Sequence, residues 1–159
     1  MNSDYIIKTT SLLSKDTLNK ITDFSKQSRS INEIASFLID CFSIEITTDP
    51  DIINGYDHDW SNIKGYAQAL SRPTNEIQVA IIIKICYNCK IPITISAGRT
   101  NLTGSATPEG GIIISIAKIN KIAEINSKEK NITCSPGVYI EDLRNHVLEK
   151  SQNNLIFPV

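Results

Sequence analysis

Apolar residues change their spacing partway along the chain, from helical intervals to short continuous runs. In the first part, Leu18, Ile21 and Phe24 recur every three residues, and Ser30 with Glu33 then matches a capping box that opens a second helix. That helix carries an apolar stripe that consists of Ile31, Ile34, Ala35, Leu38, Ile39 and Phe42. We expect the stripe to face a core within the chain, with a partner-binding face as the less common alternative. Residues 1–48 are therefore predicted to form a helical leader.

After the leader, runs of β-branched residues predict short buried strands. Residues 91–95 and 112–116 are two such runs, and a shorter strand is expected at Ala69 and Leu70. Before residue 91, Thr74 is placed to cap a helix whose face includes Ile77, Ala80, Ile81, Lys84 and Ile85. A strand, a helix and a strand in this order predict a parallel crossover, and hence an α/β (α+β) fold.

The remaining segments are less regular. Residues 49–55 contain Pro, Asn and Gly and are expected to form a loop, and residues 56–65 are expected to be irregular. Further short apolar runs lie at residues 123–125 and 132–134, and a last helix is predicted from about Ile140 to Lys150.

The segment between the two main strands, residues 96–111, is rich in small and hydroxyl residues, and we call it the glycine loop. Its glycines permit positive φ and close approach of the backbone to a ligand, and its hydroxyls add donors. These residues are Gly98, Gly104, Gly110 and Gly111, with Thr100, Thr103 and Ser105. Successive backbone N–H groups in such a loop form a nest for an anion such as phosphate or pyrophosphate, although an ordinary connection between strands has a similar composition.

Two well-known phosphate loops are excluded by residue type. The glycine loop contains no Gly-Lys-Ser/Thr triplet, so it is not a Walker-type loop, and its glycines do not fall as GxGxxG before a helix. Its place after a parallel strand nevertheless puts it at the carboxyl edge of the sheet, where open α/β sheets bind their ligands.

Composition narrows the classes of partner. The chain has 159 residues, 41% of them hydrophobic, which is enough for one domain with a core. A net charge of −1 and the absence of a basic stripe argue against a nucleic-acid partner. No apolar run approaches the length of a membrane span and no signal-peptide pattern opens the chain, so we expect no transmembrane segment and a cytoplasmic location.

The four cysteines and two histidines give no metal or catalytic pattern. Cys86 and Cys89 form a CxxC motif without a second pair, and Cys41 and Cys134 are isolated. We expect reduced thiols near the end of a helix, with Cys86 helping to cover the sheet. His58, between two aspartates, and His146, expected on the surface of the last helix, receive no catalytic or metal role.

Several segments in register resemble one known family. They are residues 71–77, 90–93, 97–106, 109–111 and 135–138, together with residues 46–50 and 56–60 upstream. In this order and spacing they are similar to the amino-terminal half of the FAD-binding domain of the FAD-linked oxidases. This superfamily includes vanillyl-alcohol oxidase and p-cresol methylhydroxylase, and the resemblance is greatest to its D-lactate dehydrogenase and glycolate oxidase D-subunit branch. The resemblance covers roughly residues 44–159.

The resemblance implies a p-cresol methylhydroxylase-type fold whose first subdomain is present and whose second is partly missing. Residues 49–159 would then be the amino-terminal part of an FAD-binding domain, cut off at its carboxyl end. It further implies that the loop wraps the FAD pyrophosphate mainly through backbone N–H groups, with a second contact at a strand-to-helix turn. The implied cofactor-binding residues are Ala97, Gly98, Arg99, Thr100, Asn101, Leu102, Thr103, Gly104, Ser105, Pro136 and Gly137. In that turn, Gly137 would let the backbone approach the cofactor and Pro136 would fix its direction.

Two positions depart from the pattern of the family. Most relatives have glycine-rich sequence at Arg99, whose guanidinium would either bind pyrophosphate oxygens or point away to a surface carboxylate. Members that tether flavin covalently through this loop carry histidine where this chain has Thr100. The resemblance therefore implies non-covalent FAD.

Two hypotheses about function follow. In the first, the chain is the FAD-binding part of an oxidoreductase that oxidises a D-2-hydroxy acid by hydride transfer to FAD. The rest of the FAD and substrate domains would then come from a companion chain, or this chain would derive from a longer one. In the second, it is a non-catalytic remnant or a nucleotide-binding half-module. The related enzymes carry their catalytic histidines downstream, so no catalytic or metal residue is assigned to this chain.

Overall fold

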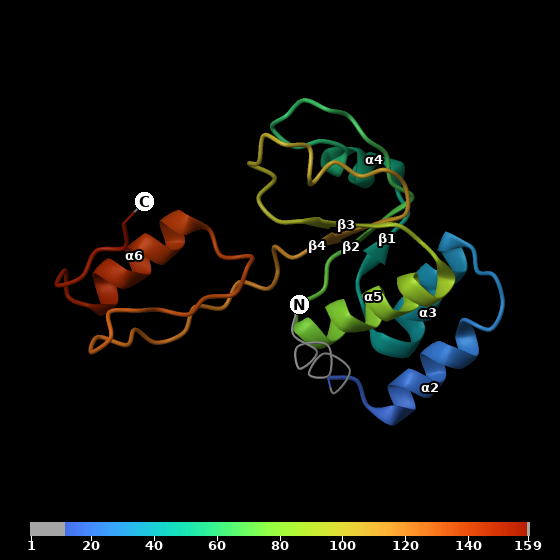
Figure 1. Ribbon diagram of the computed structural model, residues 1–159, viewed down its shortest axis with the longest axis horizontal. Helices are drawn as coiled ribbons and strands as arrows, with labels where there is room; N and C mark the ends of the chain where they lie inside the picture. The colour runs from blue at the N-terminus through green and yellow to red at the C-terminus, as the bar shows by residue number, and fades with distance from the viewer. Residues whose placement is uncertain (1–11, 159) are drawn as a thin grey trace.

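A computed structural model describes residues 12–158 of the chain. Its centre is a four-stranded sheet in the order β1-β2-β4-β3, which helices and loops cover (Figure 1). The strands are β1 (Ile46–Thr47), β2 (Ala69–Ser71), β3 (Ile93–Ser96) and β4 (Ile112–Ser115). Strand β4 pairs in parallel with both β2 and β3, whereas β1 is antiparallel to β2. The predicted parallel crossover, which connects β2 to β3, is therefore confirmed. Strand β4 lies between these two strands.

The two helices predicted in the leader are present and begin where their caps require. Helix α2 (Lys15–Phe24) starts after Ser14, whose hydroxyl accepts the Thr17 N–H, and α3 (Ile31–Phe42) starts after Ser30. Ser30 and Glu33 form both halves of the predicted capping box. This arrangement satisfies donors that an uncapped helix start leaves free.

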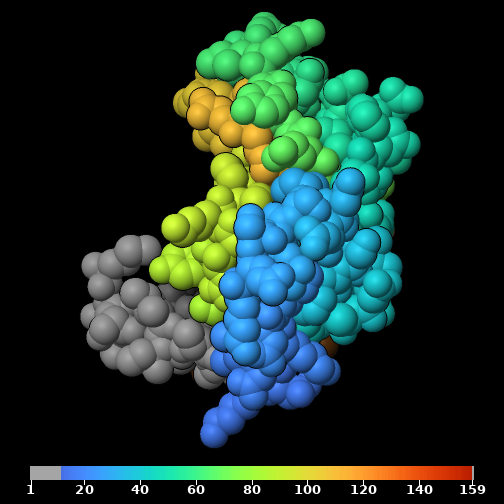
Figure 2. Space-filling model, turned by 90° about the vertical axis from the view of Figure 1, so that its right-hand side faces the viewer, coloured from blue at the N-terminus to red at the C-terminus, as the bar shows by residue number. Residues whose placement is uncertain are grey.

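The two faces of the sheet have different covers because side chains alternate along each strand. Ile112 and Ile114 pack against α2, α3 and α5 (Glu76–Cys89), in one cluster with residues of the leader stripe. Ile113 points to the other face, where it packs with Leu70 and Ile53. The leader stripe thus faces a core within the chain, as expected, although Ile39 remains 48% exposed. Figure 2 shows α2 and α3, in blue, as one continuous surface of the molecule.

Two local predictions are corrected. Residues 49–55 form helix α4 (Pro50–Ile53) and the single turn η1 (Asn54–Tyr56) instead of a loop, because the Asp49 side chain caps the Asp51 N–H and Pro fits the first turn. The cap of α5 is Asn75, whose side chain accepts the Gln78 N–H, and not Thr74. The apolar runs at residues 123–125 and 132–134 lie beside each other without forming a strand: the Ala123 N–H donates to the Thr133 carbonyl oxygen at 2.9 Å, and Ile122 makes an isolated bridge with Cys134.

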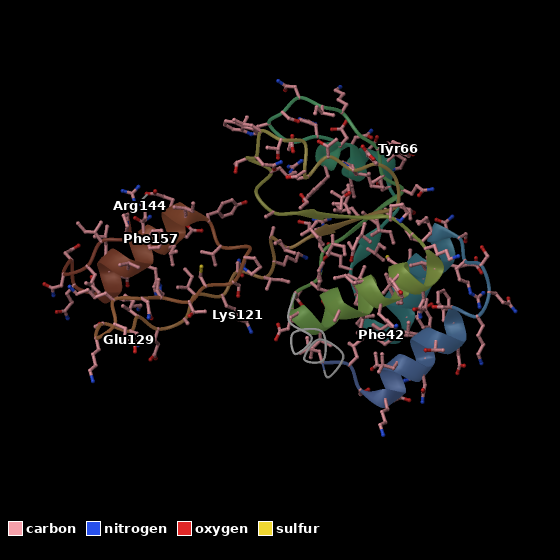
Figure 3. The ribbon with its side chains drawn as sticks, in the orientation of Figure 1. Phe42, Tyr66, Lys121, Glu129, Arg144 and Phe157 are labelled. Carbon is pink, nitrogen blue, oxygen red and sulfur yellow. The ribbon has the colours of Figure 1, made fainter. Side chains whose placement is uncertain are left out.

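The last part of the chain forms a lobe around helix α6 (Ile140–Lys150), which has the predicted bounds. Figure 1 shows this lobe beside the sheet, and Figure 3 shows the side chains of Arg144 and Phe157 within it, far from Phe42 among the helices under the sheet. Within residues 12–158, no helix is long and apolar enough to cross a membrane.

The CxxC cysteines lie at the end of α5, as predicted. Cys86 is 1% exposed in the core, and Cys89 is half-buried with its sulfur 3.8 Å from the Ser25 hydroxyl oxygen. Burial raises the pKa of the Cys86 thiol to about 12. This thiol is therefore protonated at neutral pH and serves the packing of the core.

We predict that iodoacetamide at pH 8 modifies Cys41 and Cys134 in the native protein and leaves Cys86 unmodified until the protein is denatured. The first two thiols are exposed, whereas Cys86 is buried and its pKa is raised. Mass spectrometry of tryptic peptides before and after denaturation checks this. Modification of Cys86 as fast as Cys41 would contradict the packing described.

Candidate functional site

A cleft of about 360 Å³ lies at the carboxyl edge of β3 and β4. Ser96 and Ser115 end these two strands and are paired in register, so the residues that follow them leave the sheet side by side. The cleft is lined by Ala97, Gly98, Thr100, Ala117, Pro136, Gly137, Val138, Tyr139 and Ile140. The structure thus brings together the two segments that sequence analysis selected separately.

The first wall of the cleft belongs to the glycine loop and offers backbone donors. Among residues 12–158, no hydrogen-bond partner accepts the backbone N–H groups of residues 97–105. Later N–H groups of the loop are paired, for example Gly110 with the Tyr66 carbonyl oxygen at 2.7 Å and Gly111 with the Gln68 side chain at 3.1 Å. Of residues 97–105, Ala97, Gly98 and Thr100 line the cleft, so free backbone donors are available at its wall, as an anion nest requires.

The second wall is the start of α6. Tyr139 occupies the cap position but its side chain makes no capping hydrogen bond. Within the described chain the N–H groups of Ile140, Glu141 and Asp142 have no acceptor, and Tyr139 and Ile140 line the cleft. The positive end of the helix dipole favours an anion here, although the two acidic side chains of the first turn reduce that effect.

The two glycines that line the cleft, Gly98 and Gly137, differ in the space that surrounds them. A Cβ added to Gly98 would meet only the Thr100 methyl carbon, at 3.9 Å, so the packing of this chain does not require glycine there. A Cβ on Gly137 would lie 2.3 Å from the Ile116 carbonyl oxygen, and the Gly137 N–H already donates to Ile119. Glycine at this position therefore lets the turn pack on the chain leaving β4, and the predicted approach of Gly137 to the cofactor stays a prediction.

The prediction of positive φ in the glycine loop holds for three of its four glycines. Gly104, Gly110 and Gly111 have positive φ, whereas Gly98 does not. Instead, Arg99 adopts φ 56°, a left-handed conformation that a non-glycine residue seldom takes. The glycine-rich sequence that the resemblance implies at this position would adopt it without strain.

The Arg99 guanidinium does not pair with a surface carboxylate among the described residues, which was one of its two expected directions. It lies over the Tyr56 ring at 4.4 Å and donates from Nη1 to the Gly55 carbonyl oxygen. It therefore pins the loop to the turn η1. Its predicted contact with pyrophosphate stays a prediction.

Polar side chains further along the loop turn to the protein and not to the cleft. Asn101 donates to the Asp59 carboxylate and to the Ser105 hydroxyl, and Thr103 donates to the same hydroxyl. Leu102 is 72% exposed, and Gly104 lies against Ile63. Of the predicted site residues, the cleft thus brings together Ala97, Gly98, Thr100, Pro136 and Gly137.

Sequence reasoning missed two groups of residues. The first group lines the cleft and consists of Ala117, Tyr139 and Ile140. Their positions in the sequence could have indicated this, because Ala117 follows β4 and the other two follow the Pro-Gly turn. Asp59 is 1% exposed and holds the glycine loop from a segment more than forty residues away. No local sequence pattern predicts this contact, because the fold brings together two segments that are distant in sequence.

The histidines stay outside the cleft. His58 is paired with its neighbour Asp57 on the surface, and His146 is half-buried, which corrects the expected surface position; it faces residues 122–127 across a hollow. Within the described chain, no three His, Cys, Asp or Glu side chains come together as a metal site.

A larger cavity of about 700 Å³ lies elsewhere, bordered by Arg29, Gln68 and Ile91. Gln68 and Ile91 precede β2 and β3, so this cavity is at the amino edge of the parallel strands. The Arg29 guanidinium is already engaged by Phe24 and Glu33. Because open α/β sheets bind ligands at the opposite edge, we regard the smaller cleft as the functional site.

Comparison with known proteins decides the family. The model of the FAD binding domain matches residues 67–157, which include both walls of the cleft. The chain belongs to the FAD binding domain family. It is 32% identical over 111 residues to a D-lactate dehydrogenase of Anaerostipes hadrus, covering 68% of this chain and 23% of the relative. It is 31% identical over 119 residues to a D-2-hydroxyglutarate dehydrogenase of Stutzerimonas stutzeri (strain A1501), covering 72% of this chain and 25% of the relative.

Solved structures confirm the fold of this FAD binding domain. A p-cresol methylhydroxylase with substrate bound superposes with a TM-score of 0.63 at 23% identity, over 87% of this chain and 26% of that one. An alkyldihydroxyacetonephosphate synthase gives a TM-score of 0.65 at 14% identity, over 78% of this chain and 28% of that one. The resemblance to the p-cresol methylhydroxylase type is therefore correct, and the chain spans about a quarter of the length of the relatives that it matches.

We predict effects of different size on stability for two glycines of the cleft. Gly137→Ala should lower the free energy of unfolding by about 1–3 kcal/mol, because its Cβ would overlap backbone oxygens that cannot rotate away. Gly98→Ala should change it by less than about 0.5 kcal/mol. Urea unfolding followed by circular dichroism measures both. An equal loss of stability in the two variants would refute the different packing assigned to them.

Proposed function

We propose that the chain binds FAD non-covalently and that the cleft holds the pyrophosphate of the cofactor. The free N–H groups of residues 97–105 would bind the phosphate oxygens from one side, and the start of α6 would face them from the other. The free donors on both walls are the observation that carries this proposal. Thr100, which lines the cleft, lacks the imidazole through which the resemblance implies covalent attachment of flavin at this position, and this supports non-covalent binding.

The residues of the cleft fit such a group in two respects. Gly98 leaves open space where a side chain would stand. The nearest atom to a Cβ built there is the Thr100 methyl carbon, at 3.9 Å. Donors on backbone atoms keep their positions when the ligand is absent, so binding costs little reorganisation. No lysine or arginine lines the cleft, so backbone dipoles supply the attraction for the anion.

We further propose that the complete enzyme oxidises a D-2-hydroxy acid, the type of substrate named for the D-lactate and D-2-hydroxyglutarate dehydrogenases among its relatives. When bound, the flavin supplies the chemistry by accepting a hydride from the substrate. This chain's part is to bind and orient the cofactor. Because it spans about a quarter of those relatives, we propose that the substrate site and the catalytic base belong to other parts of the enzyme, in a longer form of this chain or in a companion chain.

Titration of the purified chain with flavins tests this function. We expect FAD to bind with quenching of its fluorescence, riboflavin to bind at least about tenfold more weakly, and ADP to compete with FAD, since the pyrophosphate supplies the main contacts. Equal binding of riboflavin and FAD, or no binding of FAD, would reject the pyrophosphate site. Without a companion chain we expect no turnover of D-lactate with a dye acceptor, and turnover by the chain alone would reject the division of labour.

Two alanine variants make the test specific. Gly98→Ala should weaken FAD binding by about tenfold or more, because its methyl group would occupy the open side of the cleft. Gly55→Ala is the matched control, since a Cβ there meets no atom within 4 Å and Gly55 lies outside the cleft. If both variants bound FAD as the wild type does, the cleft would not be the binding site.

A further inference from the structure

The segment at residues 57–66 lies along the glycine loop, although more than forty residues separate them in sequence. Figure 1 shows the two stretches, green and yellow, side by side at one end of the sheet. Tyr66 bridges to Glu109, and the Tyr66 N–H donates to the Pro108 carbonyl oxygen at 2.9 Å. These contacts fix the end of the glycine loop near Pro108 and Glu109, but they do not involve residues 97–105, which carry the free N–H groups.

Asp59 makes the connection to that half. Its Oδ2 accepts a hydrogen bond from the Asn101 amide and another from the Ala106 N–H at 3.3 Å, while its Oδ1 accepts the Ser61 N–H at 2.9 Å. The carboxylate is 1% exposed although no lysine or arginine pairs with it among the described residues. A buried carboxylate without a cation depends on its donors, and each of these donors is held in place in return.

The contacts of Asn101 extend this hold along the loop. Its amide also donates to the Ser105 hydroxyl oxygen at 3.0 Å, and Thr103 donates to that same oxygen at 3.3 Å. One carboxylate therefore anchors, through a single amide, residues 101–106, which complete the nest. The side chains turn inward to Asp59, and this leaves the backbone N–H groups of the loop without internal partners.

We propose that Asp59 is a positioning residue, which holds the glycine loop in the shape that presents its backbone N–H groups to the cofactor. This role rests on the proposed function of the cleft. The hydrogen bonds, above all from the Ser61 hydroxyl, keep the pKa of the Asp59 carboxyl below its usual range. The anion persists at neutral pH, and its contribution to stability is lost only as acid lowers the pH through this reduced pKa.

Trypsin gives a readout of the loop that does not depend on FAD. Arg99 is the only lysine or arginine between residues 91 and 117, so cleavage after it reports the order of the loop alone. Lys128 and Lys130, exposed in the α6 lobe, give reference cleavages. We expect Asp59→Asn to speed cleavage after Arg99 by about tenfold, the size typical of a lost hydrogen bond to a charged group, and to weaken FAD binding by a similar factor.

Three further variants separate positioning from general stability. Asp57→Asn is the matched control, since within residues 12–158 the Asp57 side chain forms a hydrogen bond only with its neighbour His58, and it should leave both readouts unchanged. Asn101→Ala removes one donor and keeps the carboxylate, so it should reproduce the loosening if Asp59→Asn does not fold. The exchange Asp59→Asn with Asn101→Asp restores a donor and an acceptor, and it should lose less than the product of the two single losses.

Each outcome decides the proposal. Faster cleavage at Arg99 alone, with partial rescue by the exchange, supports it. Wild-type cleavage at Arg99 in Asp59→Asn, or an equal rise at Lys128 and Lys130, overturns it. If the wild type does not bind FAD, the proposed function fails, while the cleavage after Arg99 still decides whether Asp59 positions the loop.

Discussion

The parallel pairing of β3 with β4 is the constraint on which the rest of the site depends. Because Ser96 and Ser115 end the two strands in register, the chain leaves both strands at one edge of the sheet. The glycine loop starts there, and Ala117 and the turn before α6 meet it there. The pairing is held by burial of Ile112 and Ile114 on the helix side and Ile113 on the other side. A shift of one residue in register would exchange these faces and separate the walls of the cleft.

The division of tasks within the glycine loop explains its composition. The polar side chains of Asn101 and Thr107 turn toward the protein, where they donate to the Asp59 carboxylate and to the Ile63 carbonyl oxygen. Backbone N–H groups are left for a ligand, and the small residues Ala97 and Gly98 give access to them. A loop rich in Gly, Ser and Thr can therefore bind an anion with no positive side chain in the cleft. Because backbone dipoles attract the anion, a protein that we propose binds a nucleotide can have a net charge near zero.

Much of the fold could be predicted from the sequence, because local chemistry determines it. The Ser30 and Glu33 capping box, the apolar stripe of α3 and the β-branched run of β4 each depend on residues close in sequence. The errors fall where one local signal competed with another. Pro50 and Asp49 signalled a loop but formed a short helix, since the same residues also start helices, and Asn75 capped α5 in place of Thr74 beside it.

The site was predictable only in part. The glycine loop was predicted from its composition and position, and the turn at Pro136 from the resemblance; both line the same cleft. The burial of Asp59, the stacking of Arg99 on Tyr56 and the tight packing behind Gly137 depend on contacts between distant segments. Such contacts leave no periodicity or spacing in the sequence.

The amide resonances of the ¹⁵N-labelled chain during titration with FAD test the central claim most directly. The account predicts that the N–H signals of residues 97–105 and of Ile140, Glu141 and Asp142 shift, while those of Gly65 and Gly110, which are already bonded within the protein, do not. Shifts confined to the larger cavity near Arg29 and Gln68, or no shifts in the glycine loop, would contradict it.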